Sequence, residues 1–226
     1  ALAVRPMASA NECTQRMKDL VTKKTRITGN GPRLEDLPGY GDAKQWGLEA
    51  ISDLEDLRAG RIAWADFDHR GLLLAGPPGV GKSSFVAALA RSAGVPLIAT
   101  SVASWNAATY LSGTLQAMNE AFSKARRTAP SILFIDEIDG ISDRSAVREH
   151  KEYWSQIVNR LLELLQGVDD REGVIVIAAT NYPNAVDAAV RRAGRLDRQI
   201  DIHLPEPDDL AQIFRHYLGA DLPAQV

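Results

Sequence analysis

The chain has a single cysteine, Cys13, among its 226 residues, so no disulfide can form within it. No stretch resembles a secretory signal, and no uncharged apolar run approaches the roughly 18–20 residues that a membrane helix needs. The four histidines are scattered and form no HExxH or Cys/His spacing, which argues against a protein cage for a metal ion. These absences predict a protein of a reducing compartment, the cytoplasm, with no membrane segment in this chain.

An excess of charge of one sign is also absent. The 26 Lys and Arg residues against 29 Asp and Glu residues give a formal net charge of −3 at pH 7. No global basic field would therefore draw the chain to nucleic acid or anionic lipid, which leaves only a local patch as a route to such partners. The hydrophobic share of 45% and the charged share of 24% are close to the norm for globular proteins, which excludes a disordered or fibrous chain.

The first 33 residues differ from the rest of the chain. Cys13, Met17, Leu20 and Val21 fall at helical spacing and predict one short amphipathic helix, after which a Gly- and Pro-containing stretch at 29–32 interrupts the pattern. We interpret residues 1–33 as a linker or N-terminal extension from something upstream. Its helix could equally be an interaction element.

From residue 34 onward, short apolar runs alternate with amphipathic segments. The runs predict five strands, at 71–75, 96–100, 131–135, 174–178 and 199–204. Helices are expected between them, one capped by Asp42, one at 82–92, one capped by Thr114 and one at 154–165. Strands that alternate with helices pair in parallel with helices on both faces, so the predicted fold class is α/β with a five-stranded parallel sheet. Ligands of such sheets bind at the carboxyl ends of the strands.

A glycine-rich segment, GPPGVGKS at 76–83, follows the first predicted strand directly and matches the pattern GxxxxGK[ST]. Glycines let successive backbone N–H groups turn around an anion, and the N-terminus of the following helix adds its dipole. In such a loop Lys82 supplies a charge for the β- and γ-phosphates, and the Ser83 hydroxyl is a Mg²⁺ ligand. The predicted nucleotide-binding residues here are Pro78, Gly79, Val80, Gly81, Lys82, Ser83 and Ser84.

Two acidic residues, Asp136 and Glu137, directly follow the third predicted strand. A carboxylate at this end of a buried strand, beside the phosphate loop, is placed to hold Mg²⁺, usually through water, and this role suits Asp136. Glu137 can polarise a water molecule for in-line attack on the γ-phosphate, which favours hydrolysis over simple nucleotide binding. The alternative is that these residues, with Asp139, merely cap the next element.

From about residue 34 to residue 218, the chain resembles the AAA clade of the AAA+ ATPases. Four blocks carry the resemblance, GPPGVGKS (76–83), FIDEID (134–139), AATN (178–181) and DAAVRRAGRLDR (187–198). The last two are similar to the second region of homology that separates this clade from other P-loop proteins. The resemblance implies an AAA+ large α/β subdomain over 34–206 and the start of a helical lid subdomain over 207–226, with most of the lid expected to be absent.

The resemblance also implies roles for three polar residues. Asn181 matches the sensor 1 position, where a carboxamide can hydrogen-bond both the γ-phosphate and the attacking water. Arg195 and Arg198 match two arginines that the family places at a subunit boundary, where they reach the γ-phosphate of the neighbour as arginine fingers. A lone subunit would then be an incomplete enzyme, so a homo-oligomeric ring is expected, a hexamer by analogy. Arg191 and Arg192 lie close by and could pair with acids instead.

Candidates for the adenine pocket come from the same resemblance. Gly39 lies in a segment, Asp36 to Tyr40, that occupies the place of the family's Asp-hydrophobic-Gly-Gly, although Pro38 replaces the first glycine. Ile213 falls where the first lid helix contributes an apolar residue to the same pocket.

A candidate for substrate contact is the segment Tyr110-Leu111-Ser112-Gly113, which resembles a central pore loop whose aromatic residue grips an extended polypeptide. It departs from the family pattern, because Gly113 lies one residue nearer to Phe122 and the expected Glu-Ser-Glu is missing. Tyr110 could instead be an ordinary core or surface residue. The charged stretch at 142–151 is either a second pore-facing loop or a solvated connection.

The predicted function is the binding and hydrolysis of Mg-ATP by a ring-forming ATPase that remodels, unfolds or disassembles a polypeptide substrate. Two alternatives stay open. One is a nucleotide-dependent assembly scaffold with little turnover, which the presence of Glu137 disfavours. The other is a nucleic-acid motor or loader, which the acidic balance and the block from Asn181 to Arg198 disfavour.

Overall fold

The computed structural model describes residues 31–108, 110–141, 151–166 and 171–218. The helix predicted around Cys13 and most of the charged stretch at 142–151 lie outside the described residues. The division of the chain into segments 1–33, 34–206 and 207–226 stays a prediction.

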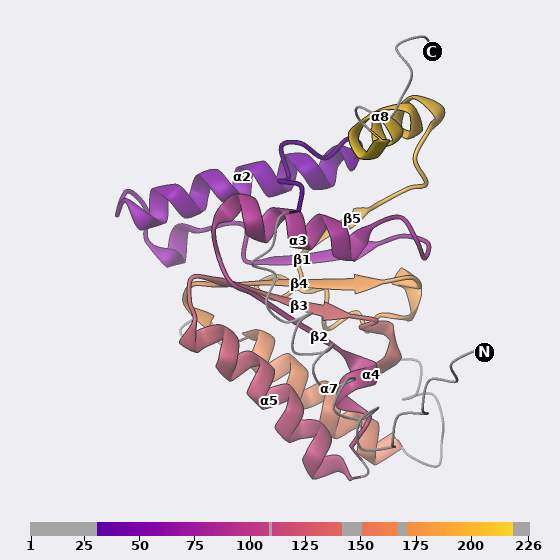
Figure 1. Cartoon of the computed structure of the whole chain (residues 1–226). Coiled ribbons are helices and arrows are strands. Elements are labelled where there is room, and N and C mark those ends of the chain that lie inside the picture. Colours follow the sequence, from indigo (N-terminus) through magenta and orange to yellow (C-terminus); the bar gives the residue numbers. More distant parts are fainter. Residues whose placement is uncertain (1–30, 109, 142–150, 167–170, 219–226) are drawn as a thin grey trace, which may run out of the picture.

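The centre of the molecule is a five-stranded sheet (Figure 1). Its strands are β1 (Gly71–Ala75), β2 (Leu97–Ser101), β3 (Ser131–Asp136), β4 (Val174–Thr180) and β5 (Arg198–Asp201). The order across the sheet is β2-β3-β4-β1-β5, and every neighbouring pair is parallel. The predicted α/β fold class is confirmed. Because all the strands run the same way, the loops that follow β1, β3 and β4 emerge at one edge of the sheet.

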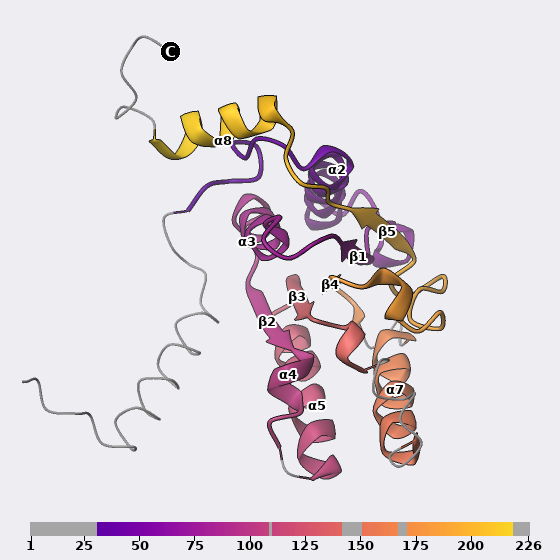
Figure 2. The ribbon, with the colours of Figure 1, turned by 90° about the vertical axis from the view of Figure 1, so that its right-hand side faces the viewer.

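Helices cover both faces of the sheet (Figures 1 and 2). One face carries α2 (Gly41–Arg58) and α3 (Lys82–Ala93), and the other carries α4 (Val102–Trp105), α5 (Leu111–Arg127) and α7 (Lys151–Gln166). The short turns η1 (Trp64–Asp66) and η4 (Pro183–Ala185) lie in connections. The last helix, α8 (Pro207–Leu218), follows β5 and lies beside the segment that enters α2.

Side-chain alternation along the strands divides the apolar interior into two cores. Within β1, Leu72 and Leu74 pack with the α2 and α3 side, whereas Leu73 packs with the α5 and α7 side. All three side chains are fully buried. This is the pattern expected of a parallel strand that is covered on both faces, and it explains why the strands read as continuous apolar runs.

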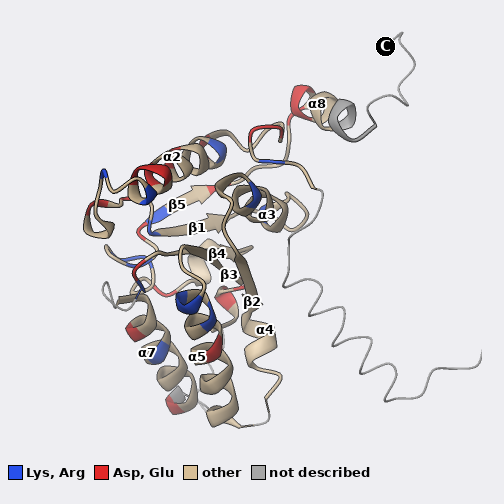
Figure 3. Ribbon diagram, turned by 60° about the vertical axis from the view of Figure 1, so that its left-hand side comes forward, with Lys and Arg blue, Asp and Glu red and all other residues tan. Residues whose placement is uncertain are grey.

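Charged side chains lie in the terminal turns of two helices. Figure 3 shows basic residues in the last turn of α5 and acidic residues in the first turn of α8, where they complement the helix dipoles. No described helix is both long enough and apolar enough to cross a membrane.

Two predicted helix caps are wrong. Helix α2 begins at Gly41 after Tyr40, so Asp42 lies inside the first turn, and α2 has no side-chain cap. Helix α5 begins at Leu111, three residues before Thr114. Thr114 is fully buried, and its hydroxyl lies 3.2 Å from the Tyr153 hydroxyl of α7. Both helices begin before the residue predicted to cap them, so Asp42 and Thr114 lie within the helices.

One strand and one helix also differ from the prediction. Strand β5 covers Arg198–Asp201 instead of 199–204, although the Ile202 N–H still donates to the Ala75 carbonyl at 2.7 Å. Directly after β2, the unpredicted helix α4 begins with a capping box, in which the side chains of Ser101 and Ser104 each bind the backbone N–H of the other. This reciprocal pairing is the capping box that starts many helices, with Ser104 in the place usually taken by Glu or Gln.

Candidate active site

The phosphate loop connects the end of β1 to the start of α3. Gly81 ends the loop with φ 86°, a left-handed conformation that favours glycine, and it is the N-cap residue of α3. A Cβ atom on Gly81 would lie 2.3 Å from the Tyr40 hydroxyl oxygen, so there is no room for a side chain. The first N–H groups of α3 have no partner within the helix, and they present a site for an anion.

Lys82 is the buried cation of this site. Its side chain is 8% exposed, and its ammonium donates to the Gly76 carbonyl at 2.7 Å, the Pro77 carbonyl at 3.0 Å and Asn181 Oδ1 at 2.7 Å. Burial lowers the pKa of Lys82 from its usual value, and the nearby carboxylates of Asp136 and Asp139 oppose that shift. The structure therefore brings Lys82 and Asn181 into direct contact. A phosphate that binds Lys82 has to replace some of these three hydrogen bonds, because an ammonium has three donors.

Ser83 and Asp136 face each other across the start of α3 and the end of β3. The Ser83 hydroxyl oxygen lies 3.5 Å from Asp136 Oδ2. Neighbouring ligands of an octahedral Mg²⁺ lie about 3.0 Å apart when each bond is about 2.1 Å. The two oxygens are thus close enough to serve one cation, directly or through a water molecule. Among the described residues, no group of three or more His, Cys, Asp or Glu side chains forms an all-protein metal site.

Glu137 lies at a sharp turn directly after β3. Its φ of 55° is a left-handed value that non-glycine residues adopt at a cost of about 1 kcal/mol or more. Two hydrogen bonds fix the turn, one from the Glu137 N–H to Asp136 Oδ1 at 2.9 Å and one from the Ile138 N–H to the Ala179 carbonyl at 3.0 Å. The turn leaves the Glu137 side chain exposed to solvent at the strand end where the phosphate loop also emerges.

A buried hydroxyl joins this turn to the end of β4. Thr180 is 1% exposed, and its Oγ1 donates to Asp139 Oδ1 at 2.5 Å and accepts the Tyr182 N–H at 2.9 Å. Thr180 precedes Asn181, and Asp139 follows Glu137 by two residues, so one side-chain pair ties together the two loops that carry these candidates. The sequence reasoning missed the role of Thr180. The sequence did contain a sign of this role, because Thr180 carries a hydroxyl at the end of a continuous apolar strand, and a buried hydroxyl needs a hydrogen-bond partner.

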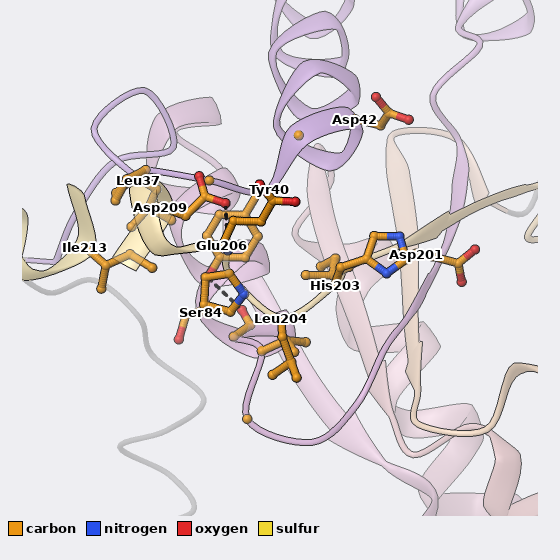
Figure 4. Close-up of a pocket in the computed structure, with 18 residues that line it drawn as sticks. Leu37, Tyr40, Asp42, Ser84, Asp201, His203, Leu204, Glu206, Asp209 and Ile213 are labelled. Atoms are coloured by element: carbon orange, nitrogen blue, oxygen red, sulfur yellow. Dashed lines mark hydrogen bonds between the residues drawn. The ribbon is translucent and has the colours of Figure 1, made fainter. Parts of the chain in front are cut away.

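A pocket of about 600 Å³ adjoins the phosphate loop (Figure 4). Gly39 and Ile213, the two adenine-pocket candidates, both line it, and they come from the segment before α2 and from α8. The phosphate loop contributes Gly79, Val80, Gly81 and Ser84 to the lining. The structure thus brings the adenine-pocket candidates and the phosphate loop to one cavity.

The two candidate arginine fingers lie apart from the phosphate loop of their own chain. The Arg195 guanidinium donates to the Ala189 carbonyl at 2.6 Å and to Gln166 Oε1 at 2.8 Å. Arg198 is exposed and lies opposite Leu72, near the start of β1. The phosphate loop begins beyond the other end of β1, about 10 Å further along the strand at about 3.3 Å per residue.

The two pore-loop candidates have different environments. Tyr110 is 75% exposed and precedes the first turn of α5. Leu111, its neighbour, is partly buried and packs against the core on the α5 and α7 side. Of the two, Tyr110 is the more exposed to another molecule.

Comparison with known proteins gives the family. The model of the ATPase family associated with various cellular activities (AAA) matches residues 72–204. The chain is 36% identical to an ATP-dependent zinc metalloprotease FtsH of Ureaplasma parvum over 207 residues, which cover 89% of this chain and 28% of that protein. It is 30% identical to the mitochondrial inner membrane i-AAA protease supercomplex subunit YME1 of Saccharomyces cerevisiae over 208 residues, 92% of this chain and 27% of that protein.

A third relative is the ATPase family gene 2 protein of Saccharomyces cerevisiae, 41% identical over 139 residues, 62% of this chain and 18% of that protein. The chain thus spans less than a third of the length of each of these three relatives. The parallel sheet, the phosphate loop at its edge and these matches agree, and the chain belongs to the AAA family of ATPases, which bind and hydrolyse ATP.

Proposed function

We propose that this chain is the ATPase module of a ring-forming homo-oligomer, a hexamer by analogy, which uses the hydrolysis of Mg-ATP to remodel, unfold or disassemble polypeptides. The observation that carries the proposal is the position of Arg195 and Arg198. Both lie toward the opposite end of β1 from the phosphate loop, which supports a role for these arginines at the phosphates of a neighbouring subunit.

The site residues divide the work. Lys82 and the N-terminal N–H groups of α3 bind the phosphates, and Ser83 and Asp136 would hold Mg²⁺. The magnesium ion, when bound, neutralises charge that develops on the phosphate oxygens. Glu137 accepts a proton from the attacking water, and Asn181 hydrogen-bonds that water and the γ-phosphate.

Arginines from the neighbouring subunit complete the site. Their contribution in related phosphate-transfer enzymes is about 10³- to 10⁵-fold in rate. In its own chain Arg195 is held by the Ala189 carbonyl and the Gln166 side chain, both uncharged partners. Neither of these two partners neutralises the positive charge of Arg195, which can then act on a phosphate across the interface.

Two observations support a polypeptide substrate. Tyr110 presents an exposed aromatic ring at the start of α5, which suits stacking on an extended chain. Two of the relatives are named as an ATP-dependent protease and a protease subunit, and both act on polypeptides by those names.

Mixing two inactive variants tests the proposal. Glu137→Gln removes the base but keeps the fingers, and Arg195→Ala removes a finger but keeps the base. Each variant alone should lose at least about 100-fold in ATP turnover. In a 1:1 mixture about a quarter of the interfaces pair an intact base with an intact finger, so about a quarter of the wild-type rate should return.

The control is Arg126→Ala, which removes an exposed arginine from the last turn of α5 and should leave turnover unchanged. No recovery at any mixing ratio would contradict the action of Arg195 across an interface. A wild-type oligomer that releases no phosphate would favour a nucleotide-dependent scaffold instead.

A further inference from the structure

Tyr40 has an unusual backbone conformation beside the phosphate loop. Its φ of 69° is left-handed, which costs a non-glycine residue about 1–3 kcal/mol and persists only where surrounding contacts hold it. Tyr40 lines the pocket of about 600 Å³ together with the phosphate loop, and Figure 4 shows it among the labelled residues of the lining. Tyr40 precedes Gly81 of the phosphate loop by 41 residues, so closeness in the sequence does not explain why the two residues are in contact.

Both the ring and the hydroxyl of Tyr40 contact the start of α3. The ring packs against Phe85, a fully buried residue of α3, with the two ring centroids 5.5 Å apart. The hydroxyl donates to the Gly81 carbonyl at 3.2 Å. Since a Cβ at residue 81 would lie 2.3 Å from this hydroxyl oxygen, the glycine and the tyrosine fit each other.

The Gly81 carbonyl accepts a second hydrogen bond, from the Phe85 N–H at 2.9 Å. Two donors therefore fix the direction of this carbonyl. In a trans peptide the carbonyl and the following N–H point in opposite directions, so the same contacts fix the N–H of Lys82. That N–H belongs to the first turn of α3, where the helix leaves its donors without internal partners, and it points toward the anion site.

We propose that Tyr40 is a positioning residue of the nucleotide site, whose hydroxyl holds the Gly81–Lys82 peptide in the orientation that binds phosphate. The proposal rests on the assignment of the phosphates to Lys82 and the start of α3. Tyr40 acts on the backbone of the loop, and ATP and ADP both place a β-phosphate there. It therefore affects the affinity for both nucleotides.

Tyr40→Phe removes the hydroxyl and keeps the ring. The Kd for ATP and the Kd for ADP should both rise about 3- to 10-fold, the range for the loss of one hydrogen bond. The KM for ATP should rise by a similar factor, whereas kcat should stay within about twofold of wild type, because Glu137 and Asn181 are unchanged. A residue with a merely structural role would lower the melting temperature without this selective change in KM.

Tyr153→Phe is the matched control. It makes the same chemical change at a hydroxyl that contacts Thr114 between α5 and α7, away from the pocket, and should leave both Kd values unchanged. A second measurement is the hydrogen exchange of the phosphate-loop amides without nucleotide. Exchange there should accelerate in Tyr40→Phe and not in Tyr153→Phe.

The outcomes separate this inference from the proposed function. Wild-type Kd values and wild-type amide exchange in Tyr40→Phe would overturn the role of Tyr40, even if Lys82→Ala abolishes ATP binding as expected. If Lys82→Ala still binds ATP with wild-type affinity, the placement of the phosphates is wrong and the role of Tyr40 falls with it. If Tyr40→Phe and Tyr153→Phe weaken ATP binding equally, the effect is a general loss of stability and the inference is refuted.

Discussion

The hydrogen bond between Thr180 and Asp139 allows a quantitative test of how the site is held together. Thr180→Val keeps the shape of the side chain and removes its hydroxyl. The variant loses a hydrogen bond to a carboxylate, worth about 1.5–3 kcal/mol, and leaves the partly buried Tyr182 N–H without this acceptor. We expect the free energy of unfolding to fall by about 2–4 kcal/mol. The melting temperature of a domain of this size should then fall by about 5–15 °C.

The effect on activity follows from the position of this pair. Asn181 follows Thr180 directly, and the Glu137 turn precedes Asp139, so loss of the bond weakens the link between the two loops and leaves the backbone hydrogen bond from Ile138 to Ala179. We expect kcat for ATP hydrolysis to fall at least about 10-fold, with a smaller change in the affinity for nucleotide, since the phosphate loop itself is untouched.

The matched variant is Thr180→Ser, which keeps the hydroxyl and removes one methyl group at a cost of about 1 kcal/mol. Chemical denaturation without nucleotide gives both free energies, and a phosphate-release assay gives both rates. The reasoning is refuted if Thr180→Val unfolds within about 0.5 kcal/mol of Thr180→Ser, or if the two variants hydrolyse ATP equally fast.

Three further predictions follow from other contacts. Glu137→Gln should keep ATP bound and lower turnover by about 10²- to 10⁴-fold, as single-turnover assays would show; normal turnover would remove Glu137 from its role. Gly71→Ala should destabilise the fold by about 1–3 kcal/mol or more, because its Cβ would lie 1.8 Å from the Arg195 carbonyl oxygen; a wild-type melting curve would contradict the close approach. Arg171→Met should leave the melting temperature unchanged or raise it, because Arg171 is 3% exposed, burial lowers its pKa to about 10, and its Nε and Nη1 have no hydrogen-bond partner among the described residues. A fall of several degrees for Arg171→Met would show that its bond to the Gly194 carbonyl outweighs the cost of the buried charge.

The fold was predictable because its three central strands, β1, β3 and β4, are buried on both faces. Each of these strands reads as a continuous apolar run, and an α-helix separates β1 from β2 and β3 from β4, which is enough to indicate a parallel sheet. The meeting of Lys82, Asp136 and Asn181 follows from the same rule, since each comes at or just after the carboxyl end of one of these strands.

The errors and omissions have tertiary causes. Asp42 and Thr114 have good capping chemistry, but the helices begin earlier, and Thr114 forms its hydrogen-bonding contact with another helix instead. Tyr40 contacts Gly81 only because α2 and α3 pack on the same face of the sheet. Such contacts between distant segments have no signature in local residue patterns.

The position of strand β1 has a consequence for the coupling of ATP sites between subunits of the proposed ring. Its last residue leads into the phosphate loop, while its first residue, Gly71, lies directly beneath the carbonyl of Arg195. The strand is about 13 Å long and buried along its whole length, so its two ends are expected to move together. One end of the strand leads into the loop that we propose binds the subunit's own ATP, and the other end approaches the backbone of Arg195, which we propose reaches the ATP of the next subunit. A small rotation of this strand would therefore change the geometry of two neighbouring ATP sites together, without displacement of any other element of the domain.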